Sequence, residues 1–126
     1  MAKILVADDS QFMRTTLTNV IRKLNHEVAA EAKTGKEAVQ LYRKHRPDLV
    51  FMDITMPDMN GIEAVKLIKK DDPDASIIIC SAMGQQKIVV EAIEAGAKDF
   101  IVKPFEEVRI VETIERHTME YRNAER

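Results

Sequence analysis

The chain has 126 residues, of which 45% are hydrophobic and 32% are charged. That length and balance are typical of a single soluble globular domain with a packed core, and they exclude a long low-complexity segment. The formal net charge of -2 argues against direct binding to nucleic acid, and the single cysteine, Cys80, excludes an intramolecular disulfide.

The sequence shows no sign of targeting or membrane insertion. Met1, Ala2 and Lys3 lead straight into a short apolar run, and no apolar span is long enough to cross a bilayer. No group of Cys and His residues has the spacing of a zinc site. We therefore expect a cytoplasmic protein without membrane insertion.

Five short apolar runs alternate with five longer amphipathic stretches. The runs predict strands at residues 4–7, 28–30, 49–52, 77–80 and 100–102. After each run, apolar residues recur with helical spacing, at 13–24, 38–42, 62–68, 88–93 and 108–114. Because the strand runs are almost continuously apolar, they suit a parallel sheet covered by helices. The pattern predicts one α/β domain over residues 1–126.

Two of the predicted helices begin with capping residues. Thr34 with Glu37, and Asn60 with Glu63, each place a side-chain acceptor three residues before a carboxylate that can return a hydrogen bond. At the end of the chain, the charged segment 116–126 has two interpretations, an extension of the last helix or a tail.

Polar residues follow the predicted strands. In an open parallel sheet the ligand crevice lies beyond the carboxyl ends of the strands, where the sequence places Asp8, Asp9, Asp53, Ser81 and Lys103. Three carboxylates gathered there would repel one another unless a cation lay among them. Because all three offer oxygen ligands, the sequence predicts a Mg²⁺ site.

The other two residues favour phosphoryl chemistry. Lys103 and Ser81 can hold a phosphoryl group while a carboxylate oxygen of Asp53 acts as the nucleophile. Taken singly, each feature has a simpler interpretation: residues 8–10 as a helix cap, Lys103 as a surface lysine and Ser81 as a turn residue. Their shared position at matching strand ends favours the site.

Four motifs carry a family resemblance: VADDS at residues 6–10, FMDITMPDMNG at 51–61, CSA at 80–82 and KPF at 103–105. Together they resemble the receiver domain of two-component response regulators across nearly the whole chain. The resemblance implies a flavodoxin-like (βα)5 fold, with a five-stranded parallel sheet in the order 2-1-3-4-5 and helices on both faces. That order comes from the known family fold, because periodicity alone predicts only an alternating α/β chain.

The resemblance also implies roles for the residues at the strand ends. Asp53 accepts a phosphoryl group from a phosphohistidine on a sensor histidine kinase, and Ser81 and Lys103 hold the phosphoryl oxygens. The direct ligands of Mg²⁺ are then Asp9, Asp53 and the backbone carbonyl of Thr55. Asp8 acts on the metal mostly through water. The protein is then a signalling phosphoacceptor, not an enzyme, and it catalyses only its own phosphotransfer and dephosphorylation.

A switch and a cis peptide bond are implied as well. The Ser81 hydroxyl, drawn toward the phosphoryl group, is coupled to inward rotation of the aromatic residue three positions before the lysine, here Phe100. The family often has Tyr at that position, and an ordinary core Phe is the alternative interpretation. The peptide bond before Pro104 is expected to be cis.

Within the family, the segments DSQFMR, CSAMGQQ and AGAKDFIVKPF look most like single-domain chemotaxis regulators. This similarity implies that phosphorylation changes the surface formed by the fourth helix, the fifth strand and the fifth helix. A flagellar motor switch protein is the implied output partner, and a phosphatase is a further one. The residues proposed for that surface are Gln86, Val90, Ala97 and Lys98.

Two alternatives remain at this point. One is a receiver that controls another output, such as transcription. The other is a magnesium-dependent phosphohydrolase with an aspartyl-phosphate intermediate. Haloacid-dehalogenase-type enzymes of that kind usually carry D-x-D after the first strand, whereas Asp53 comes directly after the third run and is followed by Ile54 and Thr55. A flavin or nucleotide module is disfavoured because no glycine-rich phosphate loop follows any strand.

Overall fold

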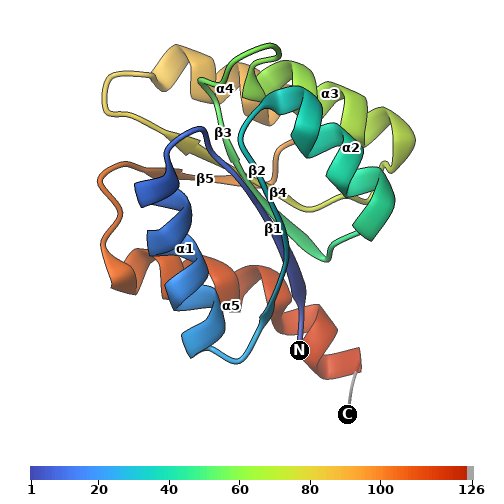
Figure 1. Ribbon diagram of the computed structural model, residues 1–126, viewed down its shortest axis with the longest axis vertical. Helices are drawn as coiled ribbons and strands as arrows, with labels where there is room; N and C mark the ends of the chain where they lie inside the picture. Colours follow the sequence, from blue (N-terminus) through green and yellow to red (C-terminus); the bar gives the residue numbers. More distant parts are fainter. Residues whose placement is uncertain (125–126) are drawn as a thin grey trace.

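The five apolar runs form one parallel sheet. The computed structural model describes the backbone of residues 1–124 and the side chains of residues 1–118. Its strands are β1 (Lys3–Ala7), β2 (Glu27–Ala32), β3 (Leu49–Asp53), β4 (Ile77–Ser81) and β5 (Asp99–Val102). They lie in the order β2-β1-β3-β4-β5, and each pair is parallel (Figure 1). The expected sheet and strand order are confirmed.

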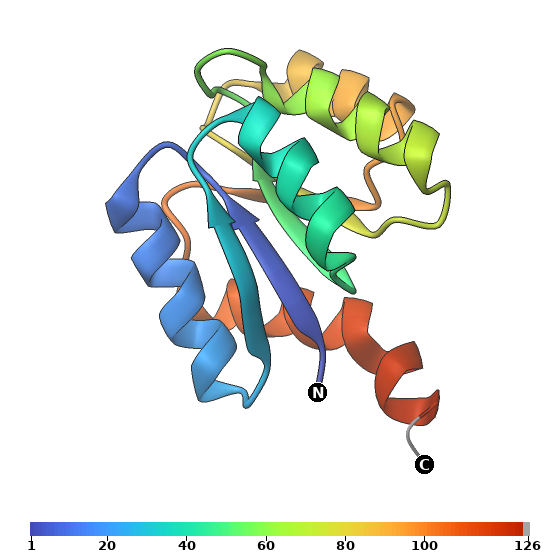
Figure 2. The same cartoon turned by 45° about the vertical axis from the view of Figure 1, so that its right-hand side comes forward.

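Helices cover both faces of the sheet. They are α1 (Gln11–Lys23), α2 (Gly35–His45), α3 (Gly61–Asp71), α4 (Gln86–Glu94) and α5 (Glu107–Ala124). Helices α1 and α5 lie on one face, whereas α2, α3 and α4 lie on the other (Figure 2). This arrangement confirms the flavodoxin-like α/β class. Within residues 1–124, no helix is both long and apolar enough to cross a membrane.

The charged segment at the end of the chain continues the last helix. Helix α5 runs to Ala124 and so includes most of the segment 116–126. Residues 125–126 lie outside the described part of the chain. For residues 116–124, helix extension is therefore the correct one of the two interpretations.

Alternation along the central strands divides the core into two parts. Leu5, Val50 and Ile79 pack with apolar residues of α2, α3 and α4. Their strand neighbours Ile4 and Phe51 pack with residues of α1 and α5 on the opposite face. All five are fully buried. Burial on both faces explains the continuous apolar runs and holds the strands firmly beneath their polar ends.

The predicted helix caps form, with one correction. The Thr34 hydroxyl accepts a hydrogen bond from the Glu37 amide (3.0 Å), and the Asn60 side-chain oxygen accepts one from the Glu63 amide (2.9 Å). The Glu37 carboxylate accepts from the amide of Lys33 (2.9 Å), one residue before the cap, and not from Thr34. The return bond of Glu37 therefore reaches one residue further back than the spacing predicted.

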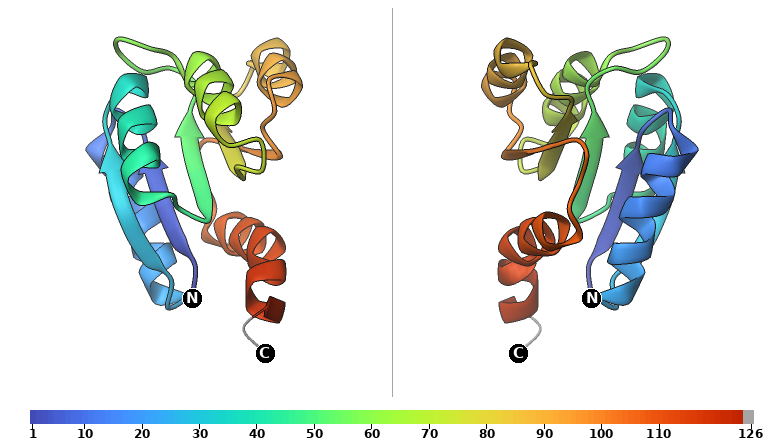
Figure 3. Two further views of the ribbon diagram at one scale, coloured as in Figure 1. Left: turned by 90° about the vertical axis from the view of Figure 1, so that its right-hand side faces the viewer. Right: turned by 90° about the vertical axis from the view of Figure 1, so that its left-hand side faces the viewer.

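The parallel strands aim their carboxyl ends at one edge of the sheet. The arrowheads of β1, β2 and β3 point the same way, toward the loops that lead into α1, α2 and α3 (Figure 3). Residues placed directly after these strands are therefore neighbours in space although they lie far apart in the sequence.

Candidate functional site

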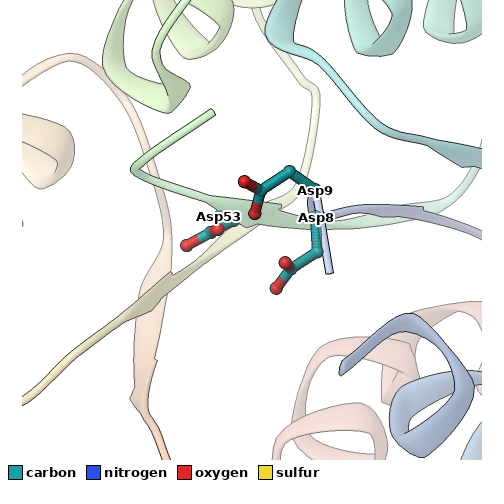
Figure 4. A group of neighbouring side chains, drawn as sticks. All are labelled: Asp8, Asp9 and Asp53. Atoms are coloured by element: carbon teal, nitrogen blue, oxygen red, sulfur yellow. The ribbon is translucent and has the colours of Figure 1, made fainter. Parts of the chain in front are cut away.

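Three carboxylates meet at the carboxyl ends of β1 and β3. Asp8 and Asp9 follow β1, Asp53 is the last residue of β3, and these two strands pair directly. One carboxylate oxygen from each residue lies within 4.8 Å of the others (Figure 4). Asp8 and Asp53 are buried, whereas Asp9 is exposed. The structure thus brings together the three side chains that the sequence assigned to a metal site.

Lys103 places a cation against two of these carboxylates. Its Nζ lies 2.9 Å from Asp8 Oδ2 and 3.2 Å from Asp53 Oδ1. Its backbone amide donates to the Ser81 carbonyl oxygen (2.7 Å), which extends the pairing of β4 and β5 up to the site. Burial lowers the pKa of Lys103, but the hydrogen bond to Asp8 and the charges of Asp53 and Asp8 outweigh burial and leave the pKa raised. Lys103 is therefore a permanent counter-charge.

The carboxyl group of Asp53 titrates close to neutrality. Burial raises its pKa most, the nearby charge of Asp8 raises it further, and Lys103 offsets part of both effects. The net result is a pKa raised from 3.8 to about 6. The ionised form is thus less stable here than in water, and a cation among the three carboxylates would relieve that cost. Such a shift in a group of converging charges is typical of a functional site.

Ser81 ends β4 beside Asp53. The register pairs Asp53 with Cys80, so Ser81 lies one position further toward the polar edge. Ser81 is buried, and its Oγ has no hydrogen-bond partner among the described residues. A buried hydroxyl left without a partner costs about 1–3 kcal/mol, so its position calls for a ligand or a second conformation. Cys80 packs in the apolar core, and burial raises the pKa of its thiol.

Glycine lets the loop after β3 pack onto the end of the strand. A side chain at Gly61 would collide with the backbone of Asp53 and Ile54. The Gly61 amide donates instead to the Ile54 carbonyl oxygen (2.7 Å). The loop that contains Thr55 is thereby held against the end of the strand that carries Asp53.

The donor set fits Mg²⁺. The three grouped side chains offer only carboxylate oxygens, and within the described residues no Cys or His belongs to the group. Mg²⁺ prefers oxygen ligands and retains several waters. Because Asp9 is exposed, one side of the group is open to water.

Phe100 is not an ordinary core residue. It is 42% exposed. With Ser81, it lines an apolar cavity of about 440 Å³ bounded by the β4–α4 loop, α4 and β5, to which Met83, Val89 and Val102 also contribute. The core interpretation of Phe100 is therefore wrong, because its side chain borders this cavity and is partly exposed instead of being covered by other side chains. The Lys103–Pro104 peptide bond is cis, as expected.

Three of the four residues proposed for an output surface are exposed. They are Gln86, Val90 and Lys98. Ala97 is buried, and that assignment is wrong. Its amide donates to the Ala92 carbonyl oxygen (3.0 Å) and its methyl group packs in the core beneath α3 and α4, so a partner could not reach it.

Sequence reasoning missed two residues around the site. Arg14 is buried on α1 and donates to the backbone carbonyl oxygen of Asp8 (2.7 Å). A signal was present, because Arg14 precedes Leu17 by three residues and therefore lies on the apolar face of its helix, where a charge requires partners. Gln85 accepts a hydrogen bond from the Ala82 amide (2.7 Å), and no sequence pattern marked it.

Comparison with known proteins identifies the family. Residues 4–115 match the response regulator receiver domain. The chemotaxis protein CheY of Thermotoga maritima is 58% identical over 114 residues, covering 90% of this chain and 95% of that protein. CheY of Bacillus subtilis is 55% identical over 114 residues, with coverage of 90% and 95%. A crystal structure of the CheX–CheY–BeF3–Mg²⁺ complex from Borrelia burgdorferi matches with a TM-score of 0.86 and 34% identity, covering 90% of this chain and 87% of that chain.

The fold, the site and the relatives agree. The strand order is that of the family, the acidic group lies at the strand ends where the motifs predicted it, and the relatives are similar over most of their own length. The phosphohydrolase alternative is left without support. The chain is a homologue of CheY and belongs to the response regulator receiver domain family.

Proposed function

We propose that the chain is a phosphorylation-activated signalling switch in chemotaxis, and that Asp53 accepts a phosphoryl group from a phosphohistidine on a sensor histidine kinase. The observation that carries this proposal is the convergence of Asp8, Asp9, Asp53 and Lys103 at one edge of the sheet. The similarity to CheY of Thermotoga maritima supports the chemotactic role.

The transfer is a displacement at phosphorus. A carboxylate oxygen of Asp53 forms a bond to phosphorus while the P–N bond to the kinase histidine breaks. The electron pair of that bond stays on the imidazole nitrogen, which then takes up a proton. The products are an acyl phosphate on Asp53 and a free histidine on the kinase. Because the pKa of Asp53 is about 6, its carboxylate is mostly ionised and nucleophilic at neutral pH.

Mg²⁺ is the proposed cofactor. When bound, it would offset the negative charge of the phosphoryl oxygens. Asp9, Asp53 and the backbone carbonyl of Thr55 are the proposed direct ligands, and Asp8 acts mostly through water. The oxygen-only group of carboxylates supports this assignment, and so does the relative crystallised with BeF3 and Mg²⁺.

Two residues are proposed to hold the phosphoryl oxygens. Lys103 already bridges Asp8 and Asp53, so its charge is in reach of a group attached to Asp53. The buried Ser81 hydroxyl has no partner among the described residues and can donate to a phosphoryl oxygen. Such preplaced donors favour the charge distribution of phosphoryl transfer.

The switch is proposed to run from Ser81 to Phe100. Both residues line the same cavity, and Phe100 is partly exposed at its edge, so inward rotation of the ring has space to occur. Movement of Ser81 toward the phosphoryl group would bias that rotation and change the surface of α4, β5 and α5. Gln86, Val90 and Lys98 are the exposed residues proposed for this surface.

The proposed output partner is a flagellar motor switch protein, and a phosphatase is a further proposed partner. The chain itself is a signalling phosphoacceptor and not a classical enzyme. Its own phosphotransfer and dephosphorylation are the only reactions that we propose it catalyses.

The test is the mass of the intact chain after incubation with Mg²⁺ and acetyl phosphate. The expected result is one added phosphoryl group, which is absent in Asp53→Asn and absent when a chelator removes the metal. Glu106→Gln, a substitution at an exposed acidic position, is the matched control and should label normally. An adduct of equal yield in Asp53→Asn would contradict the assignment.

A further inference from the structure

Arg14 is a buried cation at the start of α1. It is 6% exposed and lies on the same helix face as Leu17 and Ile21, which pack into the core. Removing a guanidinium from water is expensive unless its donors are bonded. Arg14 must therefore have partners that determine where it lies.

The Arg14 side chain bonds to two residues, one in the turn after β1 and one on β2. Nη1 donates to the backbone carbonyl oxygen of Asp8 at 2.7 Å, a buried hydrogen bond. Nε donates to Glu31 Oε1 on β2 at 3.1 Å. Arg14 thus ties helix α1 to the turn that carries the acidic pair and to the neighbouring strand.

The contacted carbonyl group belongs to the peptide that joins Asp8 to Asp9. Because a peptide unit is planar, fixing its oxygen fixes the direction in which the chain enters Asp9. The other groups of Asp8 are also held: its amide donates to the Ala32 carbonyl oxygen (3.0 Å), and its Oδ1 accepts from the Ser10 amide (2.9 Å). Asp9 is exposed, so the place of its carboxylate depends on this backbone.

We propose that Arg14 is a positioning residue for the magnesium site: by binding the Asp8 carbonyl oxygen it aims the carboxylates of Asp8 and Asp9 at Asp53. This inference rests on the proposed function, in which those three carboxylates bind Mg²⁺. Arg14 is not one of the proposed ligands of the metal or of the phosphoryl group, so it acts on the site through its bond to the turn.

The direction in which the Mg²⁺ affinity changes in an Arg14 variant distinguishes a positioning role from a purely electrostatic one. Removing a positive charge close to a cation site should by Coulomb's law strengthen Mg²⁺ binding. Loss of a residue that orients metal ligands typically weakens binding by about 10- to 100-fold. A weaker Mg²⁺ affinity in Arg14→Met therefore requires a geometric role.

The experiment is calorimetric titration of the 126-residue chain with MgCl2, in the unsubstituted protein, Arg14→Met, Arg14→Lys and Arg22→Met. Arg22 is exposed on the same helix, so its variant makes the same charge change without touching Asp8. We expect Kd to rise about tenfold in Arg14→Met, to rise less in Arg14→Lys, which keeps a donor, and to stay within about twofold in Arg22→Met.

A second readout is the Mg²⁺ concentration that gives half the maximal rate of labelling by acetyl phosphate. It should rise in Arg14→Met, while the rate at saturating Mg²⁺ stays close to that of the unsubstituted chain. Equal Mg²⁺ affinity in Arg14→Met and the unsubstituted chain, or an equal loss in Arg22→Met, would overturn the inference. If circular dichroism shows that Arg14→Met does not fold, an unchanged Kd in Arg14→Lys overturns it. Failure of the unsubstituted chain to bind Mg²⁺ would instead overturn the proposed function, and this inference with it.

Discussion

Lys103 lies closer to Asp8 than to Asp53: its Nζ is 2.9 Å from Asp8 Oδ2 and 3.2 Å from Asp53 Oδ1. The carboxylate that it holds most closely is therefore not the proposed nucleophile. Asp8 is also the more deeply buried of the two. One lysine thus neutralises a buried carboxylate and still keeps its charge within reach of Asp53.

Lys103→Met should destabilise the protein when no divalent metal is present. The substitution leaves two buried carboxylates without their cation. Because Lys103 is partly exposed, the free energy of unfolding should fall by about 3 kcal/mol, the lower end for a broken buried ion pair. Urea unfolding followed by circular dichroism measures this loss. Mg²⁺ should restore part of it, because a cation that binds only the folded state stabilises that state. Lys98→Met, which removes an exposed charge, should change stability by less than about 0.5 kcal/mol. Equal loss in both variants would contradict the bridging role.

Asp53→Asn should stabilise the metal-free protein at neutral pH, and the gain should depend on pH. The pKa of Asp53 is raised from 3.8 to about 6, so the ionised carboxyl costs folding free energy above pH 6. As the pH falls through 6, the folded state takes up the proton first and the cost decreases, and it disappears below 3.8. We expect a gain of about 1–3 kcal/mol at neutral pH. Urea unfolding of both proteins at several pH values measures it, and a gain independent of pH would be the contrary result.

Asp9→Asn should weaken Mg²⁺ binding without loss of stability. Asp9 is an exposed member of the acidic group, so its removal takes away a proposed ligand but leaves the core untouched. Calorimetric titration should show Kd for Mg²⁺ raised at least about tenfold, whereas the midpoint of thermal unfolding in metal-free buffer stays the same. Glu106→Gln removes another exposed negative charge and should leave Kd unchanged. Normal affinity in Asp9→Asn would remove Asp9 from the ligand set.

Phe100→Ala should separate phosphorylation from its structural response. Because Phe100 is partly exposed and lies on a different strand from Asp53, acetyl phosphate should label the variant at the normal rate. The amide resonances of α4 that shift on phosphorylation of the unsubstituted chain should shift much less in the variant, since no ring is left to fill the cavity beside Ser81. Phe100→Tyr keeps the ring and should respond normally. Full α4 shifts in Phe100→Ala would argue against the switch.

The sequence predicted the elements well because their signals are local. The apolar runs at 4–7 and 49–52 fall inside β1 and β3, and Thr34 and Asn60 cap α2 and α3 as the spacing indicated. The order of the strands came only from family resemblance, because it depends on where each crossover helix packs, and no run of residues records that.

The residues of the site that stand at strand ends could be predicted from the sequence. Those whose exposure or contacts depend on how the helices pack could not. Asp53 and Lys103 come together because parallel strands end at one edge. The burial of Ala97 and the exposure of Phe100 depend on which residues α4 covers, and its hydrophobic periodicity does not specify that. Arg14 was missed because its acceptor is a backbone carbonyl group, which every residue has.

Locating the phosphoryl group chemically would show directly whether Asp53 is the residue that accepts it. The 126-residue chain is treated with Mg²⁺ and acetyl phosphate and then reduced with borohydride, which converts an aspartyl phosphate to homoserine. The product is digested and mapped by mass spectrometry. We expect homoserine at position 53 and no conversion at Asp8 or Asp9, with none at any position when Mg²⁺ is chelated. Homoserine at position 8 or 9 would show that Asp53 is not the phosphoacceptor, and conversion at position 53 without Mg²⁺ would show that the reaction does not need the metal.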